Sequence, residues 1–168
     1  MKYAVIYRSR SGNTRLLAEE IYHALDVKED DKAMVDLGET AEIPEADVYF
    51  IGFAVHNNLC SMKVLDCFEK ISHGKFALFA TCGYLPIEKY KANLEKYLDA
   101  WLPEEAEYLG MFLCQGKVDA ECKTKMLEKM PDKENELHYM FDHGDTHPDG
   151  KDLDDAAEFA IKIQESVN

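Results

Sequence analysis

Long apolar runs are missing from this sequence, and its longest stretches of apolar residues are only as long as a β-strand. A helix that crosses a bilayer needs about 20 mostly apolar residues, so we expect no membrane insertion. Residues 1–8 (MKYAVIYR) have the pattern of a strand and leave no room for a charged and then apolar secretory leader. We therefore expect a cytoplasmic protein.

Cysteine is sparse and irregularly placed. The five cysteines are Cys60, Cys67, Cys82, Cys114 and Cys122, with no C-x-x-C pair among them. An odd number without regular spacing argues against a disulfide framework and against a zinc site. We expect most of these thiols to be buried as small apolar side chains.

Basic residues are outnumbered by acidic ones, 19 against 33, which gives a net charge of −14 at pH 7. Such a surface repels nucleic acid and anionic membranes, so neither is expected as a partner. The acidity can serve solubility alone, or it can attract a protein partner with a basic surface. The second interpretation becomes preferable if the chain has a redox role.

The two commonest nucleotide-binding signatures are absent. The chain has neither G-x-x-x-x-G-K nor G-x-G-x-x-G, which argues against a Mg-nucleotide loop and weakens a dinucleotide site. Repeats, low-complexity tracts and interdomain linkers are also missing. We therefore expect a single domain over residues 1–168.

Strand and helix patterns alternate along the chain. Apolar runs predict strands at residues 2–7, 32–37, 48–55, 75–81 and 108–114. Apolar residues at helical spacing predict helices at residues 14–25, 61–71, 90–101, 119–130 and 153–167, whereas residues 132–150 show no periodicity and are predicted to be a long loop. This alternation predicts an α/β fold with a parallel sheet and helices on both faces, because β-α-β crossovers are right-handed.

A dense group of small polar residues follows the first predicted strand and leads into a helix. The group is Ser9, Arg10, Ser11, Gly12, Asn13 and Thr14. A helix start offers free N–H groups and the positive end of the helix dipole, and a glycine allows a phosphate close to the main chain. The mostly neutral donors favour a phosphate monoester. The alternative is an ordinary capped helix start, since serine, asparagine and threonine suit caps.

This S-x-S-G-N-T segment resembles the FMN-phosphate loop of flavodoxins, usually written [T/S]-x-[T/S]-G-x-T. The order of predicted elements is similar too, which implies a three-layer sandwich with a five-stranded sheet in the order 2-1-3-4-5. The segments IGFAVHNN, ALFATCGY, FLCQGKVD and HPDGKDLDDA resemble short flavodoxin-like proteins of anaerobic bacteria. Some of those are associated with flavin-linked reductases such as bilirubin reductase. The resemblance implies FMN as the cofactor.

The resemblance places the isoalloxazine ring between two loops, after the third and fourth strands. In the first, cofactor contacts are expected from Ala54, Val55, His56, Asn57 and Asn58. In the second they are expected from Thr81, Cys82, Gly83 and Tyr84, with Gln115 after the fifth strand at the cofactor edge. Tyr84 is the expected stacking residue. Members of the short group often carry tryptophan where this chain has Ala54, so His56, Leu59 or a more open ring is expected on that side.

The first of these loops lacks glycine between Phe53 and Ser61. Flavodoxins commonly flip a peptide there, so that a carbonyl accepts a hydrogen bond from N5 of the one-electron-reduced flavin. Asn57 and Asn58 are the residues best able to adopt positive φ in its place. His56 can donate a hydrogen bond near N5 or simply be solvated.

We predict structural roles for two further groups of potentially reactive side chains. A redox pair of Cys60 and Cys82 would need their Cα atoms within about 7 Å, a distance that sequence does not give. We expect both to be packing or lining residues and not catalytic ones. The histidine-rich residues 138–150 could bind a divalent metal, yet they lack the closed spacing of a tetrahedral metal site. We expect a structural or partner-facing loop in which Asp149 or Asp152 caps the last helix. No metal site and no catalytic residue is assigned.

These patterns favour an FMN-binding electron carrier that exchanges electrons with a redox partner enzyme. The alternative is an FMN-dependent reductase of the same fold, linked to NAD(P)H or a quinone. The lack of a second nucleotide motif and of a paired acid and base counts against it. A third possibility, a cofactor-free interaction protein, is disfavoured by the intact residues 9–14.

Overall fold

A computed structural model describes all residues, 1–168. Its five strands are β1 (Tyr3–Arg8), β2 (Lys32–Asp36), β3 (Val48–Ala54), β4 (His73–Cys82) and β5 (Glu105–Gln115). They form one parallel sheet in the order β2-β1-β3-β4-β5. The predicted strand order is therefore confirmed.

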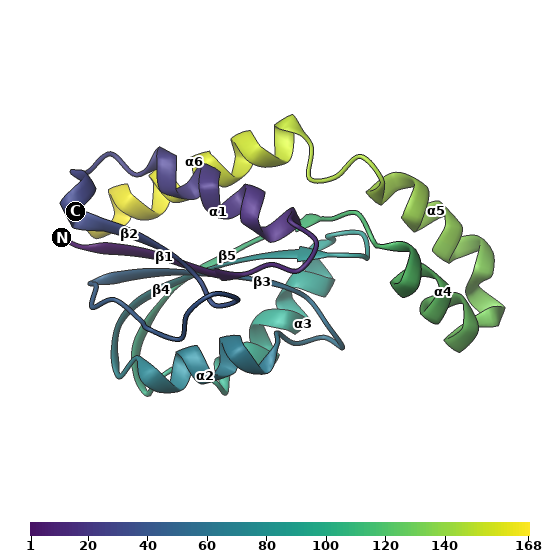
Figure 1. Ribbon diagram of the computed structural model, residues 1–168, viewed down its shortest axis with the longest axis horizontal. Helices are drawn as coiled ribbons and strands as arrows, with labels where there is room; N and C mark the ends of the chain where they lie inside the picture. Colours follow the sequence, from purple (N-terminus) through teal and green to yellow (C-terminus); the bar gives the residue numbers. More distant parts are fainter.

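Six α-helices accompany the sheet. They are α1 (Asn13–Ala24), α2 (Met62–Lys70), α3 (Glu88–Asp99), α4 (Ala120–Lys129), α5 (Glu134–Gly144) and α6 (Gly150–Val167), with short 3-10 helices η1 (Glu29–Asp31) and η2 (Pro131–Lys133). Figure 1 shows α1 and α6 on one face of the sheet and α2 and α3 on the other. The predicted three layers are confirmed. No helix has both the length and the apolar character required to cross a membrane.

The core lies in two parts, one on each side of the sheet. The larger cluster has 19 buried residues and includes Ile51, Phe68 and Leu94, which join β3 to α2 and α3. The second has 15 buried residues and includes Leu17 and Phe50, which join α1 to β3. Burial on both faces explains the unbroken apolar character of β3. The carboxyl ends of the strands are thereby held rigidly at one edge.

The prediction of a long loop over residues 132–150 is wrong. Residues 134–144 form α5, which buries Leu137, Met140 and Phe141 against the side chains of α4 and its flanks. The i, i+3, i+4 spacing of these three residues was present, but charged and histidine neighbours obscured so short a pattern. Together α4, η2 and α5 form a helical hairpin (residues 120–144) that projects beyond the carboxyl ends of the strands (Figure 1).

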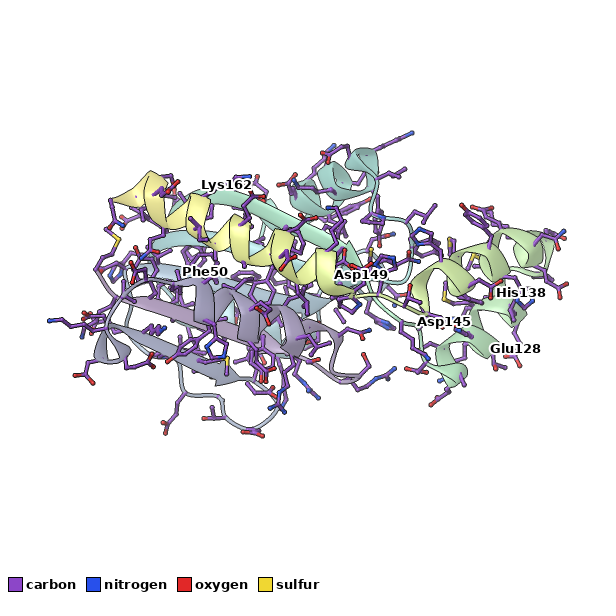
Figure 2. The ribbon with its side chains drawn as sticks, turned by 90° about the horizontal axis from the view of Figure 1, so that it is seen from above. Phe50, Glu128, His138, Asp145, Asp149 and Lys162 are labelled. Atoms are coloured by element: carbon purple, nitrogen blue, oxygen red, sulfur yellow. The ribbon has the colours of Figure 1, made fainter.

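The chain returns from this hairpin to the sheet through the start of α6 (Figure 2). Asp149 accepts a hydrogen bond from the N–H of Asp152 at 3.0 Å, and the Asp152 carboxylate accepts from the N–H of Asp149 at 2.9 Å. This reciprocal pair is a capping box. The predicted cap is therefore confirmed. The carboxylates that with His147 could suggest a metal site are used in capping, and Asp152 also lies 2.6 Å from Nδ1 of His147.

Candidate functional site

The loop at residues 9–14, the phosphate loop, ends in a helix start with unused donors. Gly12 is the N-cap of α1 with φ of 95°, and no atom lies within 4 Å of where its Cβ would be. The first helical bond runs from the N–H of Leu16 to the carbonyl of Gly12 at 3.1 Å. No backbone carbonyl accepts from the N–H groups of Asn13 or Thr14. An open glycine beside free N–H groups and a helix dipole fits a phosphate.

Several side chains of the phosphate loop hold the loop in place instead of facing outward. Ser9 Oγ accepts from the N–H of Gly12 at 3.1 Å, and Asn13 Nδ2 donates to a neighbouring carbonyl. Thr14 is only 1% exposed, and its hydroxyl lies 3.0 Å from the Thr81 hydroxyl. Thr14 can therefore offer a ligand its N–H group, while Ser11 keeps an exposed side chain.

Residues 116–119, which follow β5, also contact the phosphate loop, and sequence reasoning missed most of them. Lys117 supplies the carbonyl that Asn13 contacts at 3.0 Å, and Asp119 pairs with Arg10 at 2.7 Å. The N–H of Cys122 and then the Arg10 guanidinium lower the pKa of Asp119. A Cβ on Gly116 would lie 2.7 Å from Asn13 Nδ2. The sequence signal that could have identified residues 116–119 is their position directly after the fifth predicted strand of a parallel sheet.

The first ring loop, residues 54–60, contains a tight turn. His56 and Leu59 exchange two main-chain hydrogen bonds of 2.8 and 3.0 Å. Asn57 and Asn58 have φ of 50° and 60°, as a type I′ turn requires. The two residues judged best able to adopt positive φ in this loop do so here. Ala54 and His56 are exposed, and the N–H of Val55 donates to the Thr81 carbonyl at 2.8 Å, which joins the two ring loops.

The second ring loop, residues 81–86, presents an aromatic side chain. Tyr84 is 37% exposed, and its ring lies 5.9 Å from that of Tyr90. Partial burial and then the Glu136 carboxylate raise the pKa of Tyr84, so its hydroxyl stays protonated at neutral pH. Gly83 is needed at its position because a Cβ there would lie 2.8 Å from Val118.

The two ring-loop cysteines are poorly suited to chemistry. Both Cys60 and Cys82 are buried and unpaired, and burial raises the pKa of each thiol to about 12. The thiolate is the reactive form, so both stay inert at neutral pH. This agrees with the packing role expected for them.

Gln115 lies beneath the second ring loop. Its side chain is 1% exposed and contacts Gly83, Met140 and His143. A ligand bound at the surface of the ring loops would contact the residues of those loops and not the buried Gln115. Its amide therefore lies behind the main chain of this loop.

Comparison with known proteins agrees with this geometry. A sequence model of the flavodoxin domain matches residues 4–161. The chain belongs to the flavodoxin family. It is 33% identical to the flavodoxin-like domain-containing protein BilS of Clostridioides difficile (strain CD3), over 95% of this chain and 94% of that protein. It is 30% identical to BilS of Clostridium symbiosum (strain WAL-14163), over 91% of this chain and 90% of that one.

Solved flavodoxins share the fold of this family member. Oxidised flavodoxin 2 from Bacillus cereus superposes with a TM-score of 0.62 at 19% identity, over 99% of both chains. A flavoprotein from Lactobacillus acidophilus NCFM, solved in complex with FMN, gives 0.50 at 15% identity over 80% of this chain and 98% of that one. In the present protein the phosphate loop and both ring loops meet at the carboxyl edge of the sheet, where ligands of doubly wound folds bind.

Proposed function

We propose that this flavodoxin binds FMN and carries electrons in the cytoplasm to or from a redox partner enzyme. The observation that carries the proposal is the phosphate loop, where Gly12 has an open left-handed conformation and the following N–H groups lack backbone acceptors. Donors of this kind bind a phosphate monoester without a metal ion. FMN has such a group, and the family and the FMN-bound neighbour support it.

The residues present fit the rest of the cofactor. The phosphate would be held by the N–H groups of Asn13 and Thr14 and the hydroxyl of Ser11. The ring would lie between the exposed side chains of the two ring loops, with Tyr84 as the aromatic face. Bound FMN supplies the electron chemistry. The protein orients it, and the acidic surface lowers the potential at which an anionic reduced form is reached.

A carrier is favoured over an enzyme because the site offers no paired acid and base. The ring-loop thiols have strongly raised pKa values, and Tyr84 also remains protonated. A carrier needs only an accessible cofactor and a docking surface. The net charge of −14 suits a partner with a basic surface.

Anaerobic titration of the apoprotein into FMN, followed by flavin fluorescence, tests the proposal. We expect stoichiometric quenching at micromolar protein. Ser11→Asp and Gly12→Glu should each weaken FMN binding at least about tenfold, because a carboxylate there repels the phosphate. Ser72→Asp, an exposed serine at the opposite edge of the sheet, is the matched control and should bind like the wild type.

Riboflavin, which lacks the phosphate, separates the phosphate loop from the ring loops. Ser11→Asp should leave riboflavin binding unchanged. If FMN keeps its free fluorescence with wild-type protein at micromolar concentration, the FMN proposal is wrong. Steady-state oxidation of NAD(P)H by the FMN-loaded protein alone would instead indicate a reductase.

A further inference from the structure

Gln115, the last residue of β5, joins segments that are far apart in the sequence. Its Nε2 donates to the carbonyl of Gly83 at 3.1 Å and to the carbonyl of Met140 at 2.9 Å. Its Oε1 lies 2.6 Å from Nδ1 of His143. Both amide hydrogens go to carbonyls, so Oε1 must accept and His143 Nδ1 must carry the proton. The side-chain amide thus has a partner for each of its hydrogens and for its oxygen, in a residue that is 1% exposed.

The carbonyls of the second ring loop have separate partners. The Cys82 carbonyl accepts from the N–H of Gly116 at 2.8 Å, and the Tyr84 carbonyl accepts from the thiol of Cys82. The Gly83 carbonyl accepts from Gln115. The same amide nitrogen also binds α5. Gln115 therefore connects the second ring loop to the helical hairpin by a continuous chain of hydrogen bonds.

The helical hairpin packs on this loop more than on the sheet. Its small apolar cluster, which includes Met140, is joined by Leu85 of the second ring loop and by Val118. Figure 2 shows the hairpin residues Glu128 and His138 extending away from the sheet. A hairpin with so few neighbours is held by the contacts at its base.

The end of α5 is closely packed against the Gln115 amide. A Cβ on Gly144 would lie 2.9 Å from Nε2 and 3.2 Å from Cδ of Gln115. Gly144 has no positive φ, so alanine suits its backbone. A single added methyl group there would displace the amide while every hydrogen-bonding group remains.

We propose that Gln115 is a positioning residue of the flavin site. It holds the main chain at Gly83, and with it the neighbouring Tyr84, at a place set by the helical hairpin. Movement of α5 is thereby coupled to the loop that faces the ring. The effect on flavin rests on the proposed FMN function, whereas the position of the loop does not.

Hydrogen exchange of the apoprotein tests the position of the loop without any flavin. In Gln115→Leu, amides of residues 81–86 should exchange about fivefold faster, the effect of losing one hydrogen bond. Gln164→Leu is the matched control. Gln164 is also buried and exchanges two hydrogen bonds with the main chain of Asp26, at 3.2 and 3.3 Å, far from the loop. Gln164→Leu should leave the exchange rates of residues 81–86 unchanged.

A second pair of variants guards against misfolding of Gln115→Leu. Gly144→Ala should speed exchange of residues 81–86 in the same direction. Gly150→Ala, where no atom lies within 4 Å of the added methyl group, should not. Unchanged exchange of residues 81–86 in both Gln115→Leu and Gly144→Ala overturns the proposal.

Flavin binding tests the consequence for the site. Gln115→Leu should weaken FMN and riboflavin binding by the same factor, about fivefold, because the ring and not the phosphate is affected. The reduction potential of bound FMN should shift relative to Gln164→Leu. If Gln115→Leu binds FMN and riboflavin with the same affinities as Gln164→Leu, Gln115 does not position the flavin site. If the wild type binds no flavin at all, the proposed FMN function fails, and hydrogen exchange alone decides whether Gln115 positions the loop.

Discussion

At the scale of single residues, the five cysteines differ in what surrounds them. Burial raises the pKa of Cys60, Cys67 and Cys82 to about 12, and it raises that of Cys114 further. Cys122 is half-buried and lies in the first turn of α4. Access and thiolate formation together control thiol reactivity. The five cysteines therefore fall into four inert thiols and one accessible thiol.

We expect a single thiol to react rapidly with 5,5′-dithiobis(2-nitrobenzoate) in the native protein. The other four should react after unfolding, when burial no longer opposes their ionisation. Cys122→Ser should remove the rapid phase, and Cys60→Ser should leave it intact. Rapid reaction of a second thiol in the native protein would contradict the buried positions.

Individual site residues could be predicted by chemical type more readily than by role. The amide side chains of Asn57 and Asn58 suit positive φ, and this local property was sufficient to place them. Thr14 and Gln115 were correctly identified as donors at the carboxyl edge of the sheet. Their hydrogen bonds go to residues distant in the chain, such as Thr81, and no local pattern reveals such partners.

At the scale of elements, the N-terminus of α6 is determined by residues that are close together in the sequence. Asp149 and Asp152 satisfy each other's main-chain N–H groups. The hydrogen bond from the N–H of Asp152, followed by weaker contributions from positive charges, lowers the pKa of Asp149. Because the folded pKa is lowered, the stabilisation is complete above the unfolded value of about 3.9 and is lost as pH falls through the folded value.

Replacing Asp149 by asparagine should therefore lower stability in a pH-dependent way. The asparagine side chain would still cap the helix but would lack the charge that favours its position at a helix start. We expect the wild type to melt higher than Asp149→Asn at pH 7, with the gap closing below about pH 4. Asp149→Ala should lower the melting temperature by roughly 2–6 °C at neutral pH.

Thermal melts between pH 3 and pH 7 measure this effect. Asp154→Asn, an exposed position on the same helix, provides the control for a simple change of charge. A gap between wild type and Asp149→Asn that stays constant over this range would contradict a role for the Asp149 charge.

The helical hairpin is the element that sequence patterns missed. Its apolar side chains are few, and they become buried only because α4 and the second ring loop lie opposite them. Short amphipathic helices owe most of their stability to such packing. Its presence beside the ring loops therefore depends on tertiary contacts.

At the scale of the whole molecule, the acidic surface is the property that acts at a distance. A net charge of −14 attracts basic proteins and repels anions before contact. Salt screens such attraction within about a Debye length, which is about 8 Å at physiological ionic strength. Charge should therefore control how fast a partner docks more than how well it fits.

We expect electron transfer from the reduced, FMN-loaded protein to a basic acceptor, cytochrome c, to slow with salt. Between low and about 0.2 M ionic strength the rate should fall at least about threefold. Transfer to the anionic acceptor ferricyanide should become faster over the same range. Stopped-flow absorbance measures both reactions. Equal salt dependence for the two acceptors would show that net charge does not guide docking.

By itself the sequence determined the properties that repeat locally. Apolar runs and helical spacing specified five strands and the layers around them, because burial of periodic apolar faces is encoded residue by residue. The donors of residues 9–14 marked the phosphate loop because small polar residues and a glycine suit a helix start.

Only the tertiary structure decided which of those donors remain free. The pairs Thr14 with Thr81, Arg10 with Asp119 and Gln115 with Gly83 form between segments that the fold brings to one edge. Hydrogen bonds are short-ranged and directional, so they depend on positions that the whole packed chain sets. The hairpin beside the ring loops has the same origin.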